Sequence, residues 1–394
     1  MKEDPLITNN NQVYFSECDI DYGDLRQICS QQTLEDYYPL SDSVANNVLI
    51  YDAINLTSFI DNSKEEKRLK TELNHVLEKG PGVFVIRNLF VDCEVIDQSN
   101  DIFEKIIKKE DNSKNDHFAS GSNKRIWNSL QKLALENPEV FINYYANNIL
   151  RVVAESWCGP NFQMTAQVNI VKPGGEMQKP HRDYHLGFQE NKEIQEYPIS
   201  VQRMSQYLTL QGAVAHSEMP PESGPTMLLP NSHKYELGYL AWRNNEFQSF
   251  FCENAVQLPL KKGDGVFFNP ALFHAAGANS TNNIDRIANL LQISSVFGKT
   301  MERIDYSKII KNIYPLLLDH QKNKTLSEES LKNVCMCATD GYAFPTNLDF
   351  DANTYSGMKG FSMFEITLQA LEQSLDLDNF TTKLYEHQKI KFAS

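Results

Sequence analysis

No run of apolar residues in this sequence is long enough to cross a membrane, and residues 1–5 lead into polar sequence without the apolar core of a secretory signal. The seven cysteines are an odd number and form no Cys-x-x-Cys pair. We therefore expect reduced thiols and a cytoplasmic protein. Basic residues are scarce, since 37 Lys and Arg oppose 51 Asp and Glu. The resulting formal net charge of −14 argues against nucleic acid or an anionic membrane as a partner.

The sequence does contain many short segments that are typical of β-strands. With 41% hydrophobic residues in 394, the chain can bury a sizeable core. Turn residues separate the expected strands, which lie at 83–86, 162–171, 205–215, 226–229, 256–260, 265–268 and 286–296. Such a series predicts a jelly roll, which is a double-stranded β-helix of the cupin type. We therefore expect the α+β class, with helices before residue 160 covering one face of the core.

Helical patterns lie on both sides of these strands in the sequence. We expect helices at 63–79, 95–109 and 138–157, a helical region that begins at 125–127, and C-terminal helices at 306–320, 327–337 and 364–387. The predicted organisation is an N-terminal wrapping segment (1–62), a jelly-roll core (63–300) and a helical C-terminal extension (301–394). We expect the extension to pack on the core in one structural domain.

A His-x-Asp pair at the centre of the chain is the first candidate for chemistry. On an extended strand, His181 and Asp183 point to the same face, so both can bind one metal ion. His274, which follows a tight turn and a short apolar strand, is the best third ligand. Two imidazoles and one carboxylate on one face of an octahedral ion leave three positions open, which is the ligand set of non-haem Fe(II) oxygenases.

Arg286 follows His274 by twelve residues and lies in a segment that is typical of a strand. An arginine that points into a barrel is costly unless it meets an anion. Its planar guanidinium suits a carboxylate bound through two parallel hydrogen bonds. The distal carboxylate of 2-oxoglutarate is such an anion.

Together these residues make the chain resemble the phytanoyl-CoA dioxygenase-like family of Fe(II)/2-oxoglutarate oxygenases. Residues 222–233 are similar to the family's Asn-Gly-Pro and Pro-Gly-Ser-His segment, with Ser223 and Asn231 as differences. Gln211 falls where many members have a glutamine. Ala215 to Ser217 stand where the family usually has an acidic residue. The resemblance covers about residues 80–300.

The resemblance implies specific roles. His181, Asp183 and His274 would hold Fe(II), and 2-oxoglutarate and O₂ would take the open positions. Arg286 and Gln211 are expected to bind the co-substrate. Alternation along the expected strand at 162–171 puts Gln167 and Asn169 on one polar face, which turns either to the site or to solvent; Gln167 is a further candidate for the co-substrate, and Asn169 is a candidate for the substrate together with Tyr184 and His185 beside the metal ligands. The implied reaction hydroxylates an aliphatic carbon of a small molecule, with decarboxylation of 2-oxoglutarate to succinate and CO₂. Related halogenases have Gly or Ala in place of Asp183, so its presence favours hydroxylation.

Several questions stay open at the level of the sequence. The same three ligands would also suit a zinc hydrolase, although that reaction gives Arg286 no role. A non-catalytic jelly-roll binding protein with a vestigial metal site is the other alternative. We interpret Lys124 and Arg125 as exposed charges, with contact to an acidic group of the substrate as the alternative. We interpret residues 186–200 as a polar loop that covers the metal site. The sequence does not identify the substrate, the role of the 341–349 loop, or whether the protein is a monomer or a homodimer.

Overall fold

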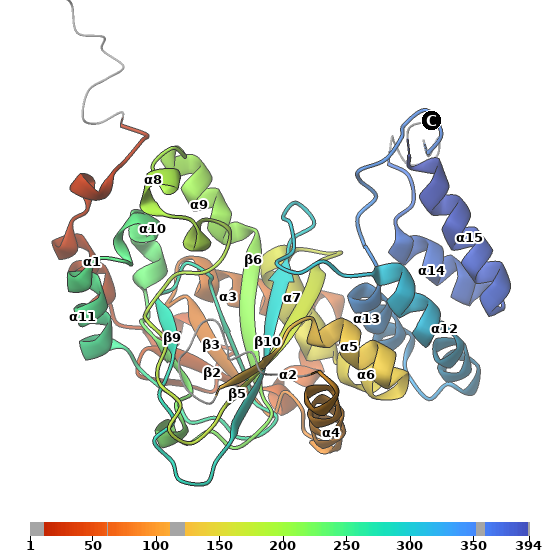
Figure 1. Ribbon diagram of the computed structural model, residues 1–394, viewed down its shortest axis with the longest axis horizontal. Helices are drawn as coiled ribbons and strands as arrows, with labels where there is room; N and C mark the ends of the chain where they lie inside the picture. The colour runs from red at the N-terminus through yellow and green to blue at the C-terminus, as the bar shows by residue number, and fades with distance from the viewer. Residues whose placement is uncertain (1–11, 61, 111–122, 352–358, 393–394) are drawn as a thin grey trace, which may run out of the picture.

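The computed structural model describes residues 12–60, 62–110, 123–351 and 359–392, and its centre is a sheet of eight strands (Figure 1). Within these residues the strand order is β1-β2-β3-β8-β6-β10-β5-β4, and only β2 and β3 pair in parallel. A second sheet pairs β7 with β9. The strands are Ser43–Ala45 (β1), Val48–Asp52 (β2), Val83–Arg87 (β3), Lys124–Ile126 (β4), Gln163–Val171 (β5), Thr209–Ala215 (β6), Thr226–Leu228 (β7), Gly265–Phe268 (β8), His274–Ala276 (β9) and Arg286–Ser294 (β10).

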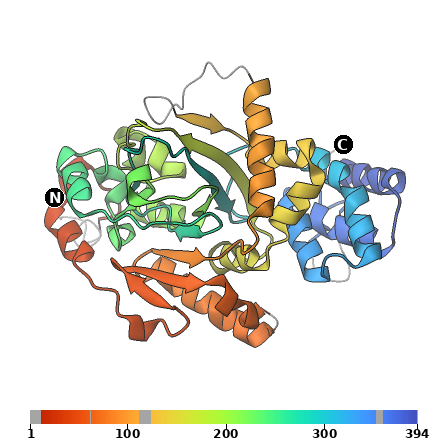
Figure 2. The ribbon, with the colours of Figure 1, turned by 90° about the horizontal axis from the view of Figure 1, so that it is seen from below.

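Helices flank this sheet on both sides. They are Tyr22–Cys29 (α1), Ala53–Ile60 (α2), Ser63–Glu78 (α3), Glu94–Lys109 (α4), Ser129–Glu136 (α5), Pro138–Tyr145 (α6), Asn148–Cys158 (α7), Asn191–Ile194 (α8), Ile199–Tyr207 (α9), Gly238–Ala241 (α10), Asn245–Asn254 (α11), Tyr306–Asn323 (α12), Glu328–Ala338 (α13), Met363–Glu372 (α14) and Leu377–Ile390 (α15). Helix α1 and the C-terminal helices α12 to α15 lie at opposite ends of the molecule (Figure 2).

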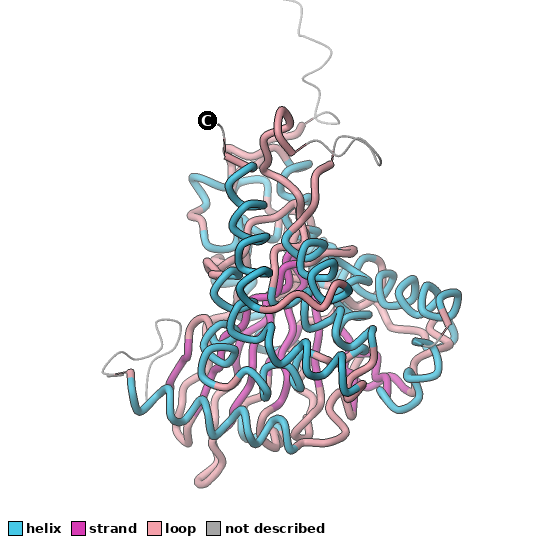
Figure 3. The backbone as a smooth tube through the Cα atoms, turned by 90° about the vertical axis from the view of Figure 1, so that its right-hand side faces the viewer, coloured by secondary structure: helices cyan, strands magenta, loops and turns pink. Residues whose placement is uncertain are grey.

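The two faces of the main sheet differ in chemistry because neighbouring residues of a strand point to opposite sides. One face is apolar and belongs to a large hydrophobic core with helices α3 to α7, to which β5 contributes Met164, Ala166 and Val168. Seen from the side of the C-terminal helices, the helices lie in front of the strands (Figure 3). The other face carries polar side chains, among them Gln167 and Asn169 of β5.

A cavity lies between this polar face and the small β7–β9 sheet, since both sheets contribute to its lining. Isolated bridges join His181 to His274 and Leu228 to Val256, so the chain around the small sheet is held by further backbone pairing. The α+β class is therefore confirmed. Two facing layers of strands around a cavity are the arrangement expected for the predicted double-stranded β-helix.

The expected helix at 63–79 is confirmed as α3. The Asn62 side chain accepts from the backbone N–H groups of Lys64 and Glu65, so Asn62 is the capping residue. The apolar stripe is buried as its helical spacing predicts, and it consists of Leu69, Leu73, Val76 and Leu77.

Two predictions before residue 160 were wrong. Residues 138–157 form two helices because the Asn147 side chain accepts from the N–H of Leu150 and starts α7 as a new helix. Residues 124–126 form strand β4, which pairs with β5 with Arg125 opposite Asn169. A segment this short depends on its partner strand, which is distant in the sequence.

Other boundaries also moved. The N-terminal segment does more than wrap the core, because β1 and β2 extend the main sheet at one edge. The expected loop at 186–200 contains a short 3₁₀ turn, α8 and the start of α9, so the following strand begins at Thr209. The expected helix at 364–387 consists of α14 and α15, and Asp376 caps the second by accepting from the N–H of Asn379.

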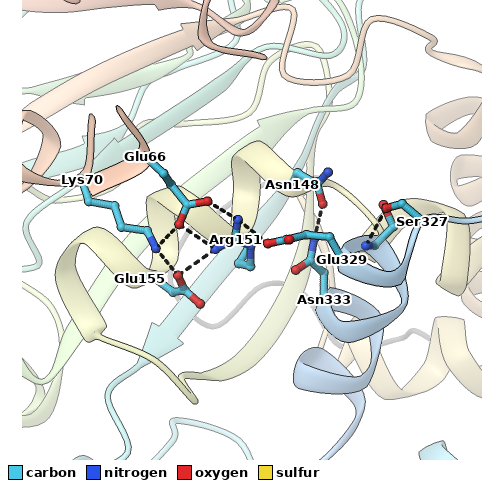
Figure 4. A network of polar contacts seen from close by, with 9 residues as sticks. Glu66, Lys70, Asn148, Arg151, Glu155, Ser327, Glu329 and Asn333 are labelled. Atoms are coloured by element: carbon cyan, nitrogen blue, oxygen red, sulfur yellow. Dashed lines mark hydrogen bonds and ion pairs between the residues drawn. The ribbon is translucent and has the colours of Figure 1, made fainter. Parts of the chain in front are cut away.

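The C-terminal extension packs on the core through both apolar and charged contacts. Buried residues of α12 to α15 belong to the same hydrophobic core as the sheet. Beside it, Arg151 of α7 lies among Glu66 of α3, Glu155 of α7 and Glu329 of α13 (Figure 4). The nitrogen–oxygen distances are 2.7, 2.9 and 2.8 Å respectively. This network therefore joins the extension to two helices of the core.

Candidate active site

Three side chains with metal-binding atoms converge at one end of the cavity. Ligand atoms of His181, Asp183 and His274 all lie within 4.8 Å of one another. Nε2 of His181 is 3.6 Å from Oδ1 of Asp183, and Nε2 of His274 is 3.5 Å from Oδ2. In the part of the chain that the structure describes, no other group of three such residues meets this criterion.

Both imidazoles are oriented by backbone carbonyls. Nδ1 of His181 lies 2.7 Å from the carbonyl oxygen of Lys179, and Nδ1 of His274 lies 2.9 Å from that of Leu272. A proton on each Nδ1 satisfies these hydrogen bonds and leaves each Nε2 with a free lone pair. Because both Nε2 atoms face the Asp183 carboxylate, the donor set fits a divalent ion such as Fe(II).

Among the residues that the structure describes, Asp183 is the one carboxylate in the cavity lining. Gln211 Nε2 donates to its Oδ2 at 2.6 Å. Burial alone would raise the pKa of Asp183, but the nearby imidazoles of His181 and His274 and the Gln211 hydrogen bond outweigh burial and hold the pKa below its usual value. Burial also lowers the pKa of His181. These shifts favour a charged carboxylate beside a neutral imidazole, which is the state that binds a metal.

The expected strand around His181 is not a regular strand. The backbone forms an isolated bridge there, in which His181 N–H donates to the His274 carbonyl at 3.0 Å and His274 N–H donates to the His181 carbonyl at 3.1 Å. This paired exchange still brings the two rings together, with centroids 4.5 Å apart. The ligand pair thus depends on β9, which is about ninety residues away, rather than on a strand of its own.

Alternate residues of the central strands line the rest of the cavity. The contributions are Gln167 and Asn169 from β5, Gln211, Ala213 and Ala215 from β6, Val266 and Phe268 from β8, and Arg286, Ala288, Leu290 and Gln292 from β10. The spacing of two residues along each strand puts all of them on the face toward the metal ligands. The cavity wall is therefore apolar at its centre, with amide and guanidinium groups at intervals.

Arg286 lies in this wall and is 3% exposed. One guanidinium nitrogen donates to the backbone carbonyl of Gly224 and the other to Oδ1 of Asn169 at 3.4 Å. The positive φ of Gly224, +75°, is a conformation that glycine adopts easily, and a side chain there would clash with the backbone of Gly277. The Gly224 turn therefore presents its carbonyl to the guanidinium.

Arg125 also lines the cavity, contrary to the interpretation of this residue as an exposed charge. Its Nη1 donates to Oε1 of Gln167 at 2.8 Å. The side chain reaches the cavity because Arg125 lies on β4, where alternate residues face this side. Had the segment been recognised as a strand, its position opposite Asn169 would have predicted this orientation.

The predicted co-substrate and substrate residues divide into two groups. Gln167, Gln211, Asn169 and Arg286 line the cavity, whereas Tyr184 and His185 are not among its lining residues. The Tyr184 hydroxyl donates to the Lys299 carbonyl at 2.8 Å, and His185 begins a 3₁₀ turn at a positive φ of 52°. The sequence predicted a strand here and not a turn, and with this turn the side chains of Tyr184 and His185 do not line the cavity.

Sequence reasoning missed several residues of the cavity wall. Gln178, Met219 and Met301 line it although they lie outside the helices and strands. Leu260 also lines it, but the strand expected at 256–260 forms only isolated bridges, and Phe188 comes from the 186–200 segment expected to cover the site. Periodic patterns identify strand faces, but they give no signal for loop residues whose position depends on the folded chain.

The sequence model of the family described as phytanoyl-CoA dioxygenase (PhyH) matches residues 79–288, more than half of the chain. The chain belongs to the phytanoyl-CoA dioxygenase family. This confirms the resemblance inferred from the sequence, in nearly the expected range. Family membership and the convergence of His181, Asp183 and His274 support the expected Fe(II) and 2-oxoglutarate chemistry, which is proposed below.

Curated relatives show the same similarity. The chain is 28% identical to the peroxisomal phytanoyl-CoA dioxygenase of Homo sapiens over 227 residues, which is 51% of this chain and 61% of the human protein. It is 26% identical to the Bos taurus protein of the same name over 246 residues, 56% of this chain and 67% of the bovine protein. The similarity to the human protein thus spans less than two thirds of its length.

Solved structures with related architecture include two from nogalamycin biosynthesis. The 2-oxoglutarate-dependent carbocyclase SnoK is 17% identical, covers 59% of this chain and 86% of its own, and has a TM-score of 0.42. The epimerase SnoN is 16% identical, covers 58% and 84%, and has a TM-score of 0.41. At such similarity, the reactions of SnoK and SnoN say nothing about the reaction of this chain. Among the described residues, no helix combines the length and apolar character needed to span a membrane.

Proposed function

We propose that this protein hydroxylates an aliphatic carbon of a small molecule, using Fe(II) held by His181, Asp183 and His274. The observation that carries the proposal is the convergence of these three ligands in one cavity with the guanidinium of Arg286. A hydrolytic metal site would need the three ligands but not the arginine. A co-substrate that both binds the metal and carries a distant carboxylate needs all four.

In this proposal the protein's own groups hold and orient the reactants. The backbone carbonyls of Lys179 and Leu272 keep both imidazoles in the tautomer that binds metal. Gln211 holds one oxygen of Asp183 by hydrogen bonding, which limits rotation of the carboxylate. Such second-layer contacts fix the ligands before the metal arrives.

Arg286 is the proposed partner of the distal carboxylate of 2-oxoglutarate. Asn169 and the Gly224 carbonyl fix the guanidinium at the wall, so little side-chain freedom is lost when the anion binds. Gln167 and Gln211 are further candidates for contacts with the co-substrate because they line the same space.

The apolar part of the wall suits a hydrocarbon substrate. Ala213, Met219, Leu260 and Phe268 line the cavity and exclude water from it. Bound Fe(II) with 2-oxoglutarate supplies the oxidising chemistry. The overall reaction joins substrate R–H, O₂ and 2-oxoglutarate to give R–OH, succinate and CO₂, so one oxygen atom enters each organic product. Asp183 fills the position at which related halogenases have Gly or Ala, so we propose hydroxylation and not halogenation.

The test is a screen for substrate-stimulated succinate formation by protein loaded anaerobically with Fe(II). The pools should contain acyl-CoA thioesters, free small acids and amino-acid-like solutes, followed by mass spectrometry of the product. We expect one pool to raise succinate formation and to yield a product heavier by one oxygen atom. A substrate that gives succinate together with a product lacking that oxygen would contradict hydroxylation. Succinate formation supported equally by Zn(II) would contradict the oxidative mechanism.

A further inference from the structure

A second cavity, of about 390 Å³, lies on the other side of the metal-binding segment. Its walls come from the C-terminal end of α3, from α9 and from residues 233–239. Arg182 lines this cavity, whereas its neighbours His181 and Asp183 line the first one. Successive side chains of this segment thus face two different cavities.

The charges around the second cavity do not balance. At its rim, Lys79 pairs with Glu78 at 3.0 Å and Arg203 pairs with Glu236 at 2.5 Å. Glu78 and Glu236 are the acidic groups of the lining, so the cations of the lining that remain without an acidic partner are Arg182 and Lys234. Within the described part of the chain, neither of these two cations has a carboxylate within ion-pair distance. The protein as a whole carries a net charge of −14, so two uncompensated cations in one cavity are not a consequence of composition.

Arg182 is held rigidly although its charge has no counterion. It is 1% exposed, and Nη2 donates to the backbone carbonyls of Ser232 at 2.6 Å and Tyr235 at 2.8 Å. The guanidinium carbon lies 5.3 Å from the ring centre of Tyr239 and 4.9 Å from that of Phe273. Gly238 permits this packing, because a side chain at that position would overlap the guanidinium. A buried cation without an anion is costly, since neutral acceptors compensate only part of its lost hydration.

The wall also offers donors to a ligand. Nε of Arg182 is buried and makes no hydrogen bond. Lys234 donates to Oε1 of Gln31 at 2.9 Å and to Oδ1 of Asn231 at 2.8 Å, which leaves one of its three N–H donors. The available donors and the uncompensated charge therefore share one cavity. Water would satisfy the donors, but only an anion would also neutralise the cations.

We propose that this second cavity binds a small oxyanion, either a phosphate or a carboxylate group, between Arg182 and Lys234. The anion replaces the missing counterion and accepts hydrogen bonds from the unpartnered donors. Because Arg182 stands between two of the proposed metal ligands, the bound anion also holds the backbone that presents them. The site is distinct from the proposed position of 2-oxoglutarate at Arg286, which lies in the other cavity.

The experiment is calorimetry and thermal unfolding of the metal-free protein with inorganic phosphate, with acetate, and with chloride at matched ionic strength. We expect phosphate or acetate to bind saturably and to raise the unfolding temperature, while chloride does not. The oxyanion that binds more tightly identifies the group carried by the natural ligand. No saturable response to either oxyanion would overturn the proposal.

Variants locate the effect. Lys234→Gln removes one charge and keeps a polar side chain, and we expect about tenfold weaker binding from the loss of one charged hydrogen bond. Arg182→Met should abolish oxyanion binding. If Arg182→Met does not fold, the affinity of Lys234→Gln for the oxyanion is the deciding measurement. Lys332→Gln is the control, because Lys332 lines a different cavity, between α13 and α14. Equal binding by the wild type and by Lys234→Gln would contradict the site. Since no metal or turnover is needed, the result is independent of the proposed oxygenase reaction.

Discussion

Two arginines, the partly buried Arg151 and the buried Arg286, have opposite surroundings. Arg151 lies among three carboxylates, those of Glu66, Glu155 and Glu329. Arg286 donates to a backbone carbonyl and to an amide oxygen, and it lines the cavity of the metal ligands. An arginine surrounded by carboxylates of several helices stabilises the fold and has no charge available for a ligand. An arginine at the wall of a cavity with neutral acceptors is positioned for an anion that comes from outside the chain.

The carboxylates of the two regions differ in the same way. Burial would raise the pKa of Glu66, but hydrogen bonds from Arg151 and Lys70 outweigh burial and lower it. Burial raises the pKa of Glu302 to about 7, because it outweighs the hydrogen bonds from the backbone of Asn128 and from Gln167 and the nearby cations Lys132 and Arg125. Cations thus outweigh burial at Glu66 in the structural network, whereas burial outweighs the cations at Glu302 near the cavity.

The largest effect is expected at Arg286. Arg286→Ala should raise the concentration of 2-oxoglutarate needed for half-maximal turnover by about 100-fold, because charged hydrogen bonds to a carboxylate are lost. Arg286→Lys should recover only part of the affinity, since the ammonium lacks the planar fork. Steady-state kinetics of succinate formation measure both. An unchanged requirement for 2-oxoglutarate in Arg286→Ala would remove this residue from the proposed role.

Arg151 should show the reverse behaviour. Arg151→Met is expected to lower the free energy of unfolding by about 3 kcal/mol, because partly buried carboxylates lose their partner. Its affinity for 2-oxoglutarate should stay the same. Denaturant unfolding measures the stability of this variant and of the control Arg68→Met, whose exposed ion pair with Glu65 should contribute less than about 1 kcal/mol. An equal loss of unfolding free energy in Arg151→Met and Arg68→Met would contradict a special role of Arg151 in stability.

Gln211 tests whether contacts behind the ligands matter. Gln211→Leu removes the 2.6 Å hydrogen bond to Asp183, and we expect about tenfold weaker Fe(II) binding, in the range typical of outer-layer substitutions. Gln202→Leu is the matched control, because Gln202 is buried away from the metal ligands. Anaerobic Fe(II) titration compares the two variants. If Gln202→Leu weakens Fe(II) binding as much, the effect of Gln211 is a general loss of packing.

The last prediction concerns the pH dependence of stability. Because the pKa of Glu302 is about 7 in the folded protein and lower when unfolded, the folded state binds more protons between pH 4.5 and 7. This group therefore makes the protein less stable as pH rises through that interval, by at most about 3 kcal/mol. Glu302→Gln should flatten this part of the stability profile and stabilise the protein at pH 8. An unchanged profile would show that Glu302 is charged throughout.

The residues with chemistry were predictable from the sequence because their types and order are restrictive. Two histidines, an aspartate and a later arginine indicated the ligand set and the family. Strand alternation put Gln167 and Asn169 on one polar face, and the structure shows that this face lines the cavity. Which cavity the side chains of Arg125 and Arg182 face was not predictable from the sequence. Arg125 depends on β4, which exists only by pairing with β5, and Arg182 depends on the bridge to β9. Both pairings join segments far apart in the sequence.

Some predicted ends of helices and strands were wrong for a related reason. Asn147 looks like an ordinary helix residue in the 138–157 pattern, yet its side chain caps α7 and divides the helix. The N-terminal strands β1 and β2 are short, and the sheet edge that they extend is formed by later parts of the chain. Periodicity reports which face of an element is buried, and not where a competing local hydrogen bond ends it.

The most direct test of the central claim is anaerobic calorimetric titration of Fe(II) into the wild type, Asp183→Ala and the control Asp264→Asn. Asp264 is a buried carboxylate that accepts from the backbone N–H groups of Asn88 and Lys261, outside the metal site. We predict one equivalent of tightly bound Fe(II) in the wild type and in Asp264→Asn, and none in folded Asp183→Ala. Stoichiometric Fe(II) binding by Asp183→Ala, with the affinity of the wild type, would contradict the assignment of the metal centre.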